Sequence, residues 1–319
     1  MKRHIPPRGP DDPRNGPVFL RRELVDQGLN DRAIARLVRS DELVKVRHGA
    51  YAASVVWHQL DDDGRFGLLG RAVLRQARAP VVLSHTSALP EYGVPTWGFD
   101  LSHVHVTRTD GLAGRRAAGV QQHCGTLRPG DLMYVDGVPV MNPARAALET
   151  TTLKNTEASL CVANHLLHHG LTTHAELNVQ YVDMTWWPDT LSAEIVLRLA
   201  DERIESVGES RTYWCCFQQG LPMPVPQYEI KDGRGRVVAR VDFAWPELGV
   251  FLEFDGRVKY EKLLRPGERA SDVVIREKRR EEEICRLTGW RCIRVTWGDL
   301  AHPARLAARI RAVLFFQAA

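Results

Sequence analysis

The segment 240–260, RVDFAWPELGVFLEFDGRVKY, constrains the fold more than any other part of the sequence. Two runs rich in apolar, β-branched and aromatic residues flank residues 246–249, PELG, which are typical of a turn. We therefore predict a β-hairpin with a four-residue loop. In this hairpin the numbers of paired residues sum to 495, as they do for Trp245 and Val250.

The same hairpin brings three carboxylates close together. Asp242 lies opposite Glu253 in the predicted register, with Cβ atoms roughly 5 Å apart. Asp255 projects from the same face as Glu253, because side chains two residues apart on a strand share a face. Like charges opposite each other destabilise a sheet, and a divalent cation such as Mg²⁺ would balance them. An ion pair between Asp255 and Arg240 is the alternative that needs no metal.

Composition sets limits on the class of protein. The 319 residues suggest two or three domains, and 44% hydrophobic residues suffice for buried cores. A net charge of +4 permits nucleic-acid binding through a local basic patch without requiring it. The six cysteines form no CxxC pair and are expected to be reduced thiols. With no signal peptide and no apolar run near the ~18 residues of a membrane span, we expect a soluble, cytoplasmic protein that does not associate with membranes.

The N-terminal region is predicted to bind DNA. Residues 1–16 are rich in Pro, Gly and charge and are expected to form a flexible tail. Residues 17–75 predict two short helices, with Gly28 ending the first and Asn30 capping the second, followed by a basic hairpin and further helix. The second helix carries three arginines in one stripe, namely Arg32, Arg36 and Arg39. This pattern is typical of a winged helix-turn-helix whose recognition helix enters the major groove.

The predicted wing of this domain contains Lys45 and Arg47. A charged face that is merely solvated is the alternative interpretation of these basic residues. The segment LVRSDELVKVRHGAYA resembles the N-terminal winged helix of AbiEi-type antitoxins. The resemblance implies duplex DNA as a partner and allows a toxin or another protein as a second partner.

Residues 76–190 are predicted to form a middle α/β region. The segments SHTSAL, HVHVTR and NPARAALE resemble the region that follows the winged helix in AbiEi-type proteins. The family usually has a threonine where Ala146 stands, so a role of that threonine is not carried over. His103 and His105 share a predicted strand, but no acidic residue or cysteine accompanies them at zinc spacing. We therefore expect no metal at these histidines.

Residues 191–319 are predicted to form the C-terminal domain. The predicted order is helix, helix, three strands, helix, strand and terminal helix. The runs RVDFAWPELGVFLEFDG and EKRREEEICRLTGWRCIRVTW resemble the PD-(D/E)XK nuclease superfamily, nearest to its very-short-patch-repair-like branch. The chain as a whole is thus predicted to be α/β, with an N-terminal winged helix-turn-helix, a middle α/β region and a C-terminal restriction-endonuclease-like α/β domain.

The nuclease resemblance implies roles for specific residues. The metal ligands for Mg²⁺ or Mn²⁺ fall on Glu209, Asp242 and Glu253. The proline that usually precedes the strand aspartate is Val241 here, which is a mild departure. Asp255 replaces the usual lysine, and a carboxylate cannot stabilise charge on a phosphate. Asp255 would instead bind the metal or orient the attacking water.

The missing positive charge has two candidate sources, Lys259 just after the strand and Lys278 on the following helix. Each of the assigned helix residues also has an ordinary explanation. Lys278 can pair with Glu282 one turn later. Glu209 follows Ser206 by three residues, which is the spacing of a capping box.

These observations predict a DNA-binding, metal-dependent endonuclease that hydrolyses phosphodiester bonds in phage defence, repair or a toxin–antitoxin setting. The alternative is a transcriptional regulator or antitoxin-like protein whose nuclease fold is catalytically inactive. The replacement of the expected lysine by Asp255 is the main reason to retain this alternative.

Overall fold

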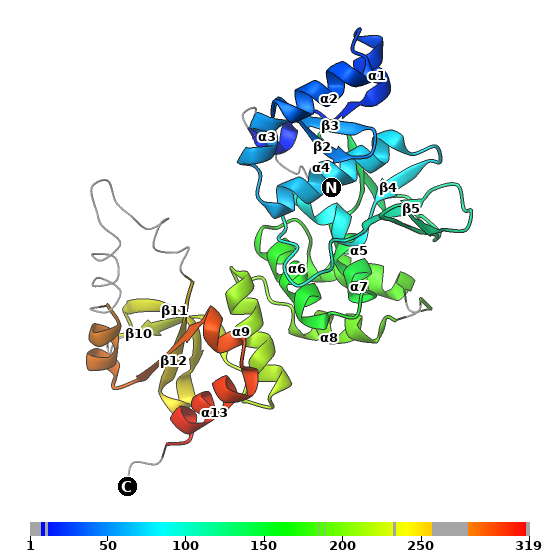
Figure 1. Ribbon diagram of the computed structural model, residues 1–319. Coiled ribbons are helices and arrows are strands. Elements are labelled where there is room, and N and C mark those ends of the chain that lie inside the picture. The colour runs from blue at the N-terminus through cyan, green and yellow to red at the C-terminus, as the bar shows by residue number, and fades with distance from the viewer. Residues whose placement is uncertain are drawn as a thin grey trace. The chain divides into compact units, whose positions relative to one another are not determined.

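The computed structural model describes residues 8–9, 12–184, 186–187, 189–231, 234–256 and 280–316. Lys259 and Lys278, both proposed above to act on phosphate, lie outside these residues. The chain divides into two compact units, Met1–Ala200 (unit 1) and Asp201–Ala319 (unit 2) (Figure 1). No helix among the described residues is long and apolar enough to cross a membrane.

The N-terminal part of unit 1 has the element order of a winged helix. Its elements are β1 (Phe19–Leu20), α1 (Arg21–Asp26), α2 (Asp31–Arg39), β2 (Leu43–Arg47), β3 (Ala50–Ala53), α3 (Ser54–Gln59) and α4 (Asp62–Gln76). The three strands form a sheet in the order β1-β3-β2, in which both pairs are antiparallel. The elements α1 and α2 lie at the top of Figure 1.

The residues predicted to begin and end the first two helices do so in the structure. The side chain of Asn30 accepts a hydrogen bond from the N–H of Ala33 at 2.9 Å and caps α2. Gly28 has a φ of +93°, which lets the chain leave α1. The core that joins sheet to helices is apolar and buried, and consists of Val18, Leu20, Ala50, Ala52, Leu60, Leu68 and Ala72.

Part of the predicted tail departs from the expectation of flexibility. Residues Pro13–Asn15 form the 3₁₀ helix η1, capped by Asp12. The Arg14 carbonyl accepts a hydrogen bond from Arg71 of α4, and Arg8 forms an ion pair with Glu91. Polar contacts therefore hold these described residues, although they have little apolar surface to bury.

The middle part of unit 1 is a six-stranded sheet with helices packed against it. The strands are ordered β6-β7-β5-β4-β9-β8. The elements are β4 (Val81–Leu83), η2 (His85–Tyr92), β5 (Val104–Arg108), β6 (Arg116–Ala117), β7 (Val120–His123), β8 (Leu132–Val135), β9 (Val138–Met141), α5 (Pro143–Thr151), α6 (Thr156–His168), α7 (His174–Met184) and α8 (Leu191–Leu199). The last helix packs against α5, α6 and α7, so unit 1 ends after α8, whereas the sequence placed a domain boundary before it.

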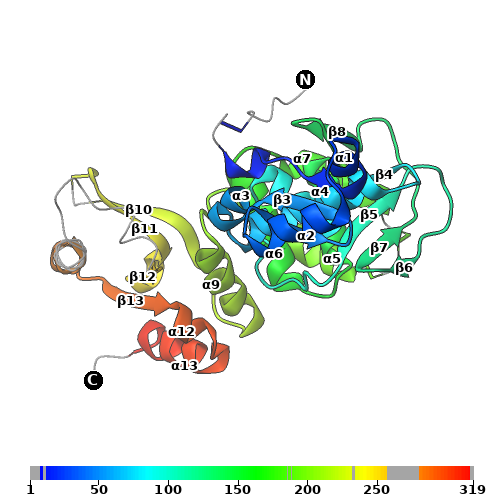
Figure 2. The same cartoon turned by 45° about the horizontal axis from the view of Figure 1, so that its top comes forward.

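Unit 2 is a four-stranded mixed sheet with helices on both faces (Figure 2). Its elements are α9 (Val207–Gln218), β10 (Val225–Lys231), β11 (Val237–Trp245), η3 (Pro246–Leu248), β12 (Val250–Asp255), the helical residues 280–288, β13 (Arg291–Thr296), α12 (Trp297–Leu300) and α13 (Pro303–Leu314). The order is β10-β11-β12-β13, with only β12 and β13 parallel among these described strands. This is the predicted succession of elements, and the chain is a mixed α/β protein as expected.

The two faces of this sheet have separate cores. One face packs against α9 and α13 through residues such as Phe243, Leu252 and Ile310. The other face packs against the helical residues 280–288 through Phe251 and Ile284. Strand alternation therefore turns alternate residues of β12 toward different helices.

Candidate functional site

The first candidate site is the exposed face of α2. Arg32, Arg36 and Arg39 are all exposed to solvent. No hydrogen bond or ion pair of their side chains with another residue is found in the described part of the chain. Asp31, in the first turn of the same helix, is neutralised by Arg21 through two hydrogen bonds of 2.7 Å. The hydrogen bonds from Arg21 also lower the pKa of Asp31, so this carboxylate stays ionised and is balanced by Arg21.

The two basic residues of the predicted wing are in different environments. Lys45 is exposed on β2 and stands on the solvent side of the hairpin. Arg47 is half-buried and donates a hydrogen bond of 3.2 Å to the carbonyl of Ala118 in the middle part of unit 1. Burial also lowers the pKa of Arg47. Arg47 therefore ties the hairpin to its own unit, whereas Lys45 remains available to an external anion.

The second candidate site is the β11–β12 hairpin, whose register agrees with the prediction. Phe243 pairs with Leu252 and Trp245 with Val250, so the residue numbers sum to 495. Asp242 is 8% exposed. One of its carboxylate oxygens accepts a hydrogen bond of 2.7 Å from the N–H of Phe254 on the partner strand. A backbone donor thus satisfies part of this buried carboxylate.

The remaining hairpin carboxylates face cations of the same unit. Glu253 lies 3.5 Å from Arg280, and Asp255 lies 3.6 Å from Arg294 on β13. The Arg240 guanidinium pairs instead with Glu205 at 2.9 Å, so it is not the cation nearest Asp255. Glu253 and Asp255 share the face of β12 that packs against the helical residues 280–288.

Glu209 serves as a cap on α9. It is 2% exposed, and its two carboxylate oxygens accept hydrogen bonds from the Ser206 hydroxyl at 2.7 Å and the Glu205 N–H at 3.1 Å. Gln227 of β10 donates a further bond of 3.0 Å. Gln227 lies between the residues that pair with Val241 and Phe243, so it neighbours Asp242 in the sheet. Glu209 is therefore both the predicted cap and a residue linked to the Asp242 region.

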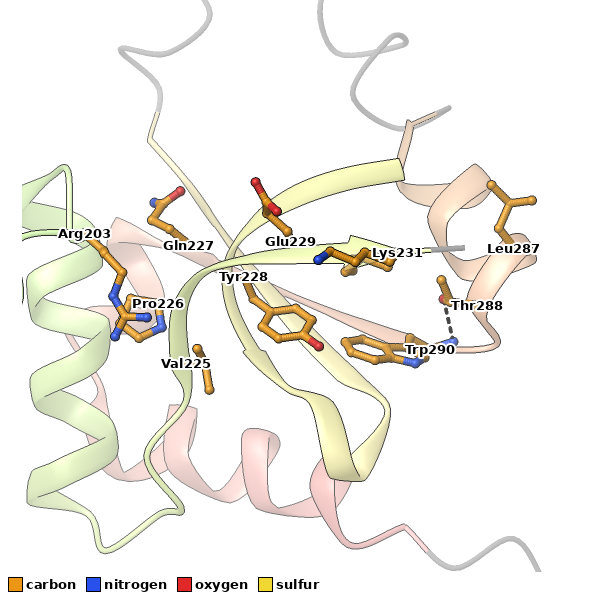
Figure 3. Close-up of a pocket in the computed structure, with 11 residues that line it drawn as sticks. Arg203, Val225, Pro226, Gln227, Tyr228, Glu229, Lys231, Leu287, Thr288 and Trp290 are labelled. Atoms are coloured by element: carbon orange, nitrogen blue, oxygen red, sulfur yellow. Dashed lines mark hydrogen bonds between the residues drawn. The ribbon is translucent and has the colours of Figure 1, made fainter. Parts of the chain in front are cut away.

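A hollow in unit 2 does not coincide with the carboxylates. It has a volume of about 590 Å³ and opens along β10 (Figure 3). Tyr228 and Trp290 lie beside each other in it, with ring centroids 5.8 Å apart. Lys231 and Glu229 line the same hollow, whereas Asp242, Glu253 and Asp255 do not.

Comparison with known proteins bears on the first of these sites. Residues 12–54 match the family model described as "Transcriptional regulator, AbiEi antitoxin". The N-terminal segment is an AbiEi-type regulator domain. This segment contains α1, α2 and both strands of the hairpin, and its structure is consistent with a winged helix.

Two relatives extend over both units. They are "Uncharacterized protein MT2308" of Mycobacterium tuberculosis (strain CDC 1551 / Oshkosh) and "Uncharacterized protein Rv2248" of Mycobacterium tuberculosis (strain ATCC 25618 / H37Rv). Each is 29% identical over 277 residues, which cover 86% of this chain and 93% of the relative. A match of this length includes part of both units.

A third cluster of functional groups was missed by the sequence prediction. His85, His105 and His123 lie in the middle part of unit 1, and each offers a ligand atom within 4.8 Å of those of the other two. His85 begins η2 just after β4, His105 lies within β5 and His123 ends β7. Within the described part of the chain, neither the set of Glu209, Asp242 and Glu253 nor the hairpin carboxylates alone converge to this degree.

The three imidazoles are neutral at ordinary pH. Burial lowers the pKa of His105 and of His123 to about 4. The pKa of His85 also lies well below its ordinary value, mainly through burial and through the neighbouring His123. His105 Nδ1 and His123 Nε2 are 2.9 Å apart, and the rings of His85 and His123 stack with centroids 3.8 Å apart.

A buried ionic network lies next to these rings. Arg145 is 2% exposed and pairs with both Glu149, at 2.9 Å, and Asp131. Glu149 also accepts a hydrogen bond of 3.1 Å from the N–H of His85. Burial raises the pKa of Glu149, and the Arg145 guanidinium opposes that rise. The SHTSAL, HVHVTR and NPARAALE segments noted in the sequence therefore meet at one place.

Proposed function

We propose that the protein is a DNA-binding transcriptional regulator of the AbiEi antitoxin type. The observation that carries this proposal is the exposed arginine stripe of α2, whose members have no described internal partner, within the segment that matches this family. Long basic side chains held out in solvent on one face of a helix suit the phosphates and base edges of duplex DNA.

The geometry suggests how the duplex is bound. The helix α2 enters the major groove, where arginine can read guanine through two hydrogen bonds. Lys45 on the hairpin contacts the phosphate backbone beside it. The bidentate pair of Arg21 and Asp31 removes the one acidic charge that would repel the backbone at the start of α2.

A salt titration of DNA binding tests this interface. The full chain is titrated against a fluorescent duplex that carries the region upstream of its own gene. Replacing Arg32, Arg36 and Arg39 together by alanine should reduce affinity by at least about 100-fold. The slope of log K against log salt concentration should become shallower by about 1 for each phosphate that the variant no longer neutralises.

The matched control is Arg305→Ala, which removes an exposed arginine from a helix of unit 2. This variant should keep both the affinity and the salt slope. Equal affinity of the wild type and the triple variant for the duplex would rule out α2 as the binding element.

A second candidate function is metal-dependent phosphodiester hydrolysis in unit 2. It is favoured by the burial of Asp242 in an otherwise apolar strand and by the link from Glu209 through Gln227 to the same part of the sheet. Asp242, Glu253 and Glu209 would hold Mg²⁺ or Mn²⁺, which activates water and stabilises charge on the phosphate. Asp255 would orient the water. Lys259 or Lys278 would supply the positive charge.

Cleavage assays separate the two candidates. Under the second proposal the full chain with Mn²⁺ nicks supercoiled DNA, and both Asp242→Asn and Glu253→Gln abolish nicking. Glu229→Gln, which alters an exposed carboxylate of the same sheet, should leave it unchanged. Specific duplex binding without any metal-dependent cleavage would leave the regulator with an inactive nuclease-like unit. A toxin that copurifies with the chain would add the expected protein partner to either outcome.

A further inference from the structure

Two strands of unit 1 and the 3₁₀ helix that follows a third strand bring one histidine each to a common point. The strand order β7-β5-β4 places the segments of His123, His105 and His85 side by side. His105 pairs with Gln121 in the parallel β5–β7 register, so His123 lies two residues further along the same face. The N–H of Ser84 bonds to the carbonyl of His105 at 3.1 Å and brings His85 to that face.

Polar neighbours hold the His85 ring and the backbone of His105 in place. The Nδ1 atom of His85 lies 3.1 Å from the Ser84 hydroxyl and 3.5 Å from Glu149. This leaves Nε2 of His85 as the nitrogen that can bind a ligand. The Ser87 hydroxyl accepts a hydrogen bond of 2.8 Å from the N–H of His105 and holds β5 in place. A carboxylate behind a histidine is a usual arrangement around protein-bound metals.

His85 also has a strained backbone. Its φ is +50°, a left-handed value that is uncommon for residues other than glycine, although asparagine, aspartate and histidine adopt it more often than the rest. The side chain is 4% exposed, so the strain cannot serve to place the ring in solvent. Strain of this kind persists where the surroundings over-determine a conformation, and such places are often binding sites.

The local charge favours a cation. Arg145 contributes one positive charge, whereas Asp131 and Glu149 contribute two negative charges to the same buried network. A cavity of about 240 Å³ reaches His105 from the surface and is also lined by Asp100. A metal ion therefore has a route to the His105 imidazole and an electrostatic reason to remain beside it.

We propose that His85, His105 and His123 form a binding site for a first-row transition metal ion, with Zn²⁺ as the natural occupant. Neutral imidazoles suit zinc, copper, iron and nickel, whereas Mg²⁺ prefers oxygen ligands. Bonds from zinc to nitrogen of about 2.0–2.1 Å place tetrahedral ligand nitrogens about 3.3 Å from one another. The ligand atoms here lie within 4.8 Å of one another, which is close to that separation. Three protein ligands leave a fourth position for water or a bound group.

The site differs in chemistry from the carboxylates of unit 2, and the two can be tested separately. Full-length protein is stripped with a chelator and titrated with Co²⁺, which reports tetrahedral nitrogen coordination through its visible absorption. One equivalent should bind, and Zn²⁺ should displace it. Retained zinc after equilibrium dialysis, measured by mass spectrometry, should also approach one equivalent.

Variants assign the ligands. His105→Gln, His123→Gln and His85→Asn should each weaken Co²⁺ binding by more than about 100-fold, since even outer partners of a metal site contribute about 10–100-fold. Asparagine is chosen at position 85 because it tolerates a positive φ. The matched control is His103→Gln, two residues from His105 on the edge of β5, because His103 instead bonds Arg116 at 3.0 Å. Asp242→Asn should bind cobalt like the wild type.

The unmodified protein provides a readout that does not depend on the variants folding. Bound Co²⁺ should give three strongly shifted imidazole N–H signals in the proton NMR spectrum. Absence of stoichiometric Co²⁺ uptake by the wild type, or uptake without these three signals, overturns the proposal. Unchanged uptake by a folded variant that lacks two of the three histidines overturns it as well.

Discussion

The histidines of unit 1 and the carboxylates of unit 2 show how differently two clusters of potential ligands can be arranged. The imidazoles of His85, His105 and His123 converge within 4.8 Å and carry no charge of their own. The carboxylates of Glu253 and Asp255 lie near each other along one strand, yet each faces an arginine of its own unit.

The two clusters differ in whether their side chains already have a partner within the protein or are left for a ligand to bind. A charged carboxylate in a sheet must be balanced by something, and unit 2 supplies arginines from the helical residues 280–288 and from β13. A neutral imidazole needs only a hydrogen bond, so it can lie beside another imidazole without a large penalty. A set of converging neutral donors is therefore stronger evidence for a metal than a set of neighbouring charges.

The largest effect on stability is expected for Glu149→Gln, which breaks the buried network next to the histidines. Both carboxylate oxygens of Glu149 are used, one by Arg145 and one by the N–H of His85. Removing the charge leaves Arg145 buried with Asp131 alone. We expect a loss of about 3 kcal/mol in the free energy of unfolding, measured by urea denaturation. Glu247→Gln, at an exposed turn position, should change it by less than about 0.5 kcal/mol.

A comparable effect, dependent on pH, is expected for Glu91→Gln. Burial alone would raise the pKa of Glu91, but Arg71 and Arg8 lower it below its ordinary value of 4.5. A depressed carboxylate pKa adds stability above the unfolded-state pKa, and this is lost as the pH falls through the folded-state pKa. At pH 7 the variant should lose about 3 kcal/mol of unfolding free energy. The difference from the wild type should shrink as the pH falls below 4.5, and a constant difference down to about pH 3 contradicts this account.

The parts of the fold that local sequence signals determine were predictable. The PELG loop led to the correct register because Gly249 has a φ of +58° and closes the predicted turn. Asn142 and Pro143 begin α5 as expected, because the asparagine side chain caps the helix through the N–H of Arg145. Ser206 and Glu209 form the predicted cap on α9. Each of these features depends on residues within one turn of each other.

The parts that depend on strand order were not predictable in this way. His105 had no partner at zinc spacing in the sequence, because its partners come from β7 and from the start of η2, just after β4, and both strands neighbour β5 in the sheet. Arg294 reaches Asp255 because β13 returns parallel to β12 after a long connection. The only early signal for the histidine site was that SHTSAL, HVHVTR and NPARAALE all stood out as motifs. Their meeting point could be known only from the sheet.

A moderate effect is expected at Asp242, where structure and chemistry can be separated. Asp242→Ala leaves the buried N–H of Phe254 without its acceptor and should lower the free energy of unfolding by about 1–3 kcal/mol. Asp242→Asn keeps an oxygen in place and should lower it by less than about 1 kcal/mol. If alanine and asparagine have equal effects in thermal unfolding, the hydrogen bond to Phe254 contributes little and the burial of Asp242 needs another explanation.

The smallest effect on stability is expected for Glu253→Gln, and it sharpens the contrast between the two clusters. The pair between Glu253 and Arg280 is partly exposed, so its loss should change the free energy of unfolding by about 0–1 kcal/mol. Replacing a metal ligand, by contrast, should greatly lower activity even where it changes the free energy of unfolding very little. If unit 2 hydrolyses phosphodiesters, Glu253→Gln should lower the rate of Mn²⁺-dependent nicking by at least about 100-fold while the fold is retained. A folded variant that nicks DNA at the wild-type rate would show that Glu253 pairs with Arg280 and does not bind a catalytic metal. Of the two metal sites proposed for the chain, only the histidine site of unit 1 would then remain.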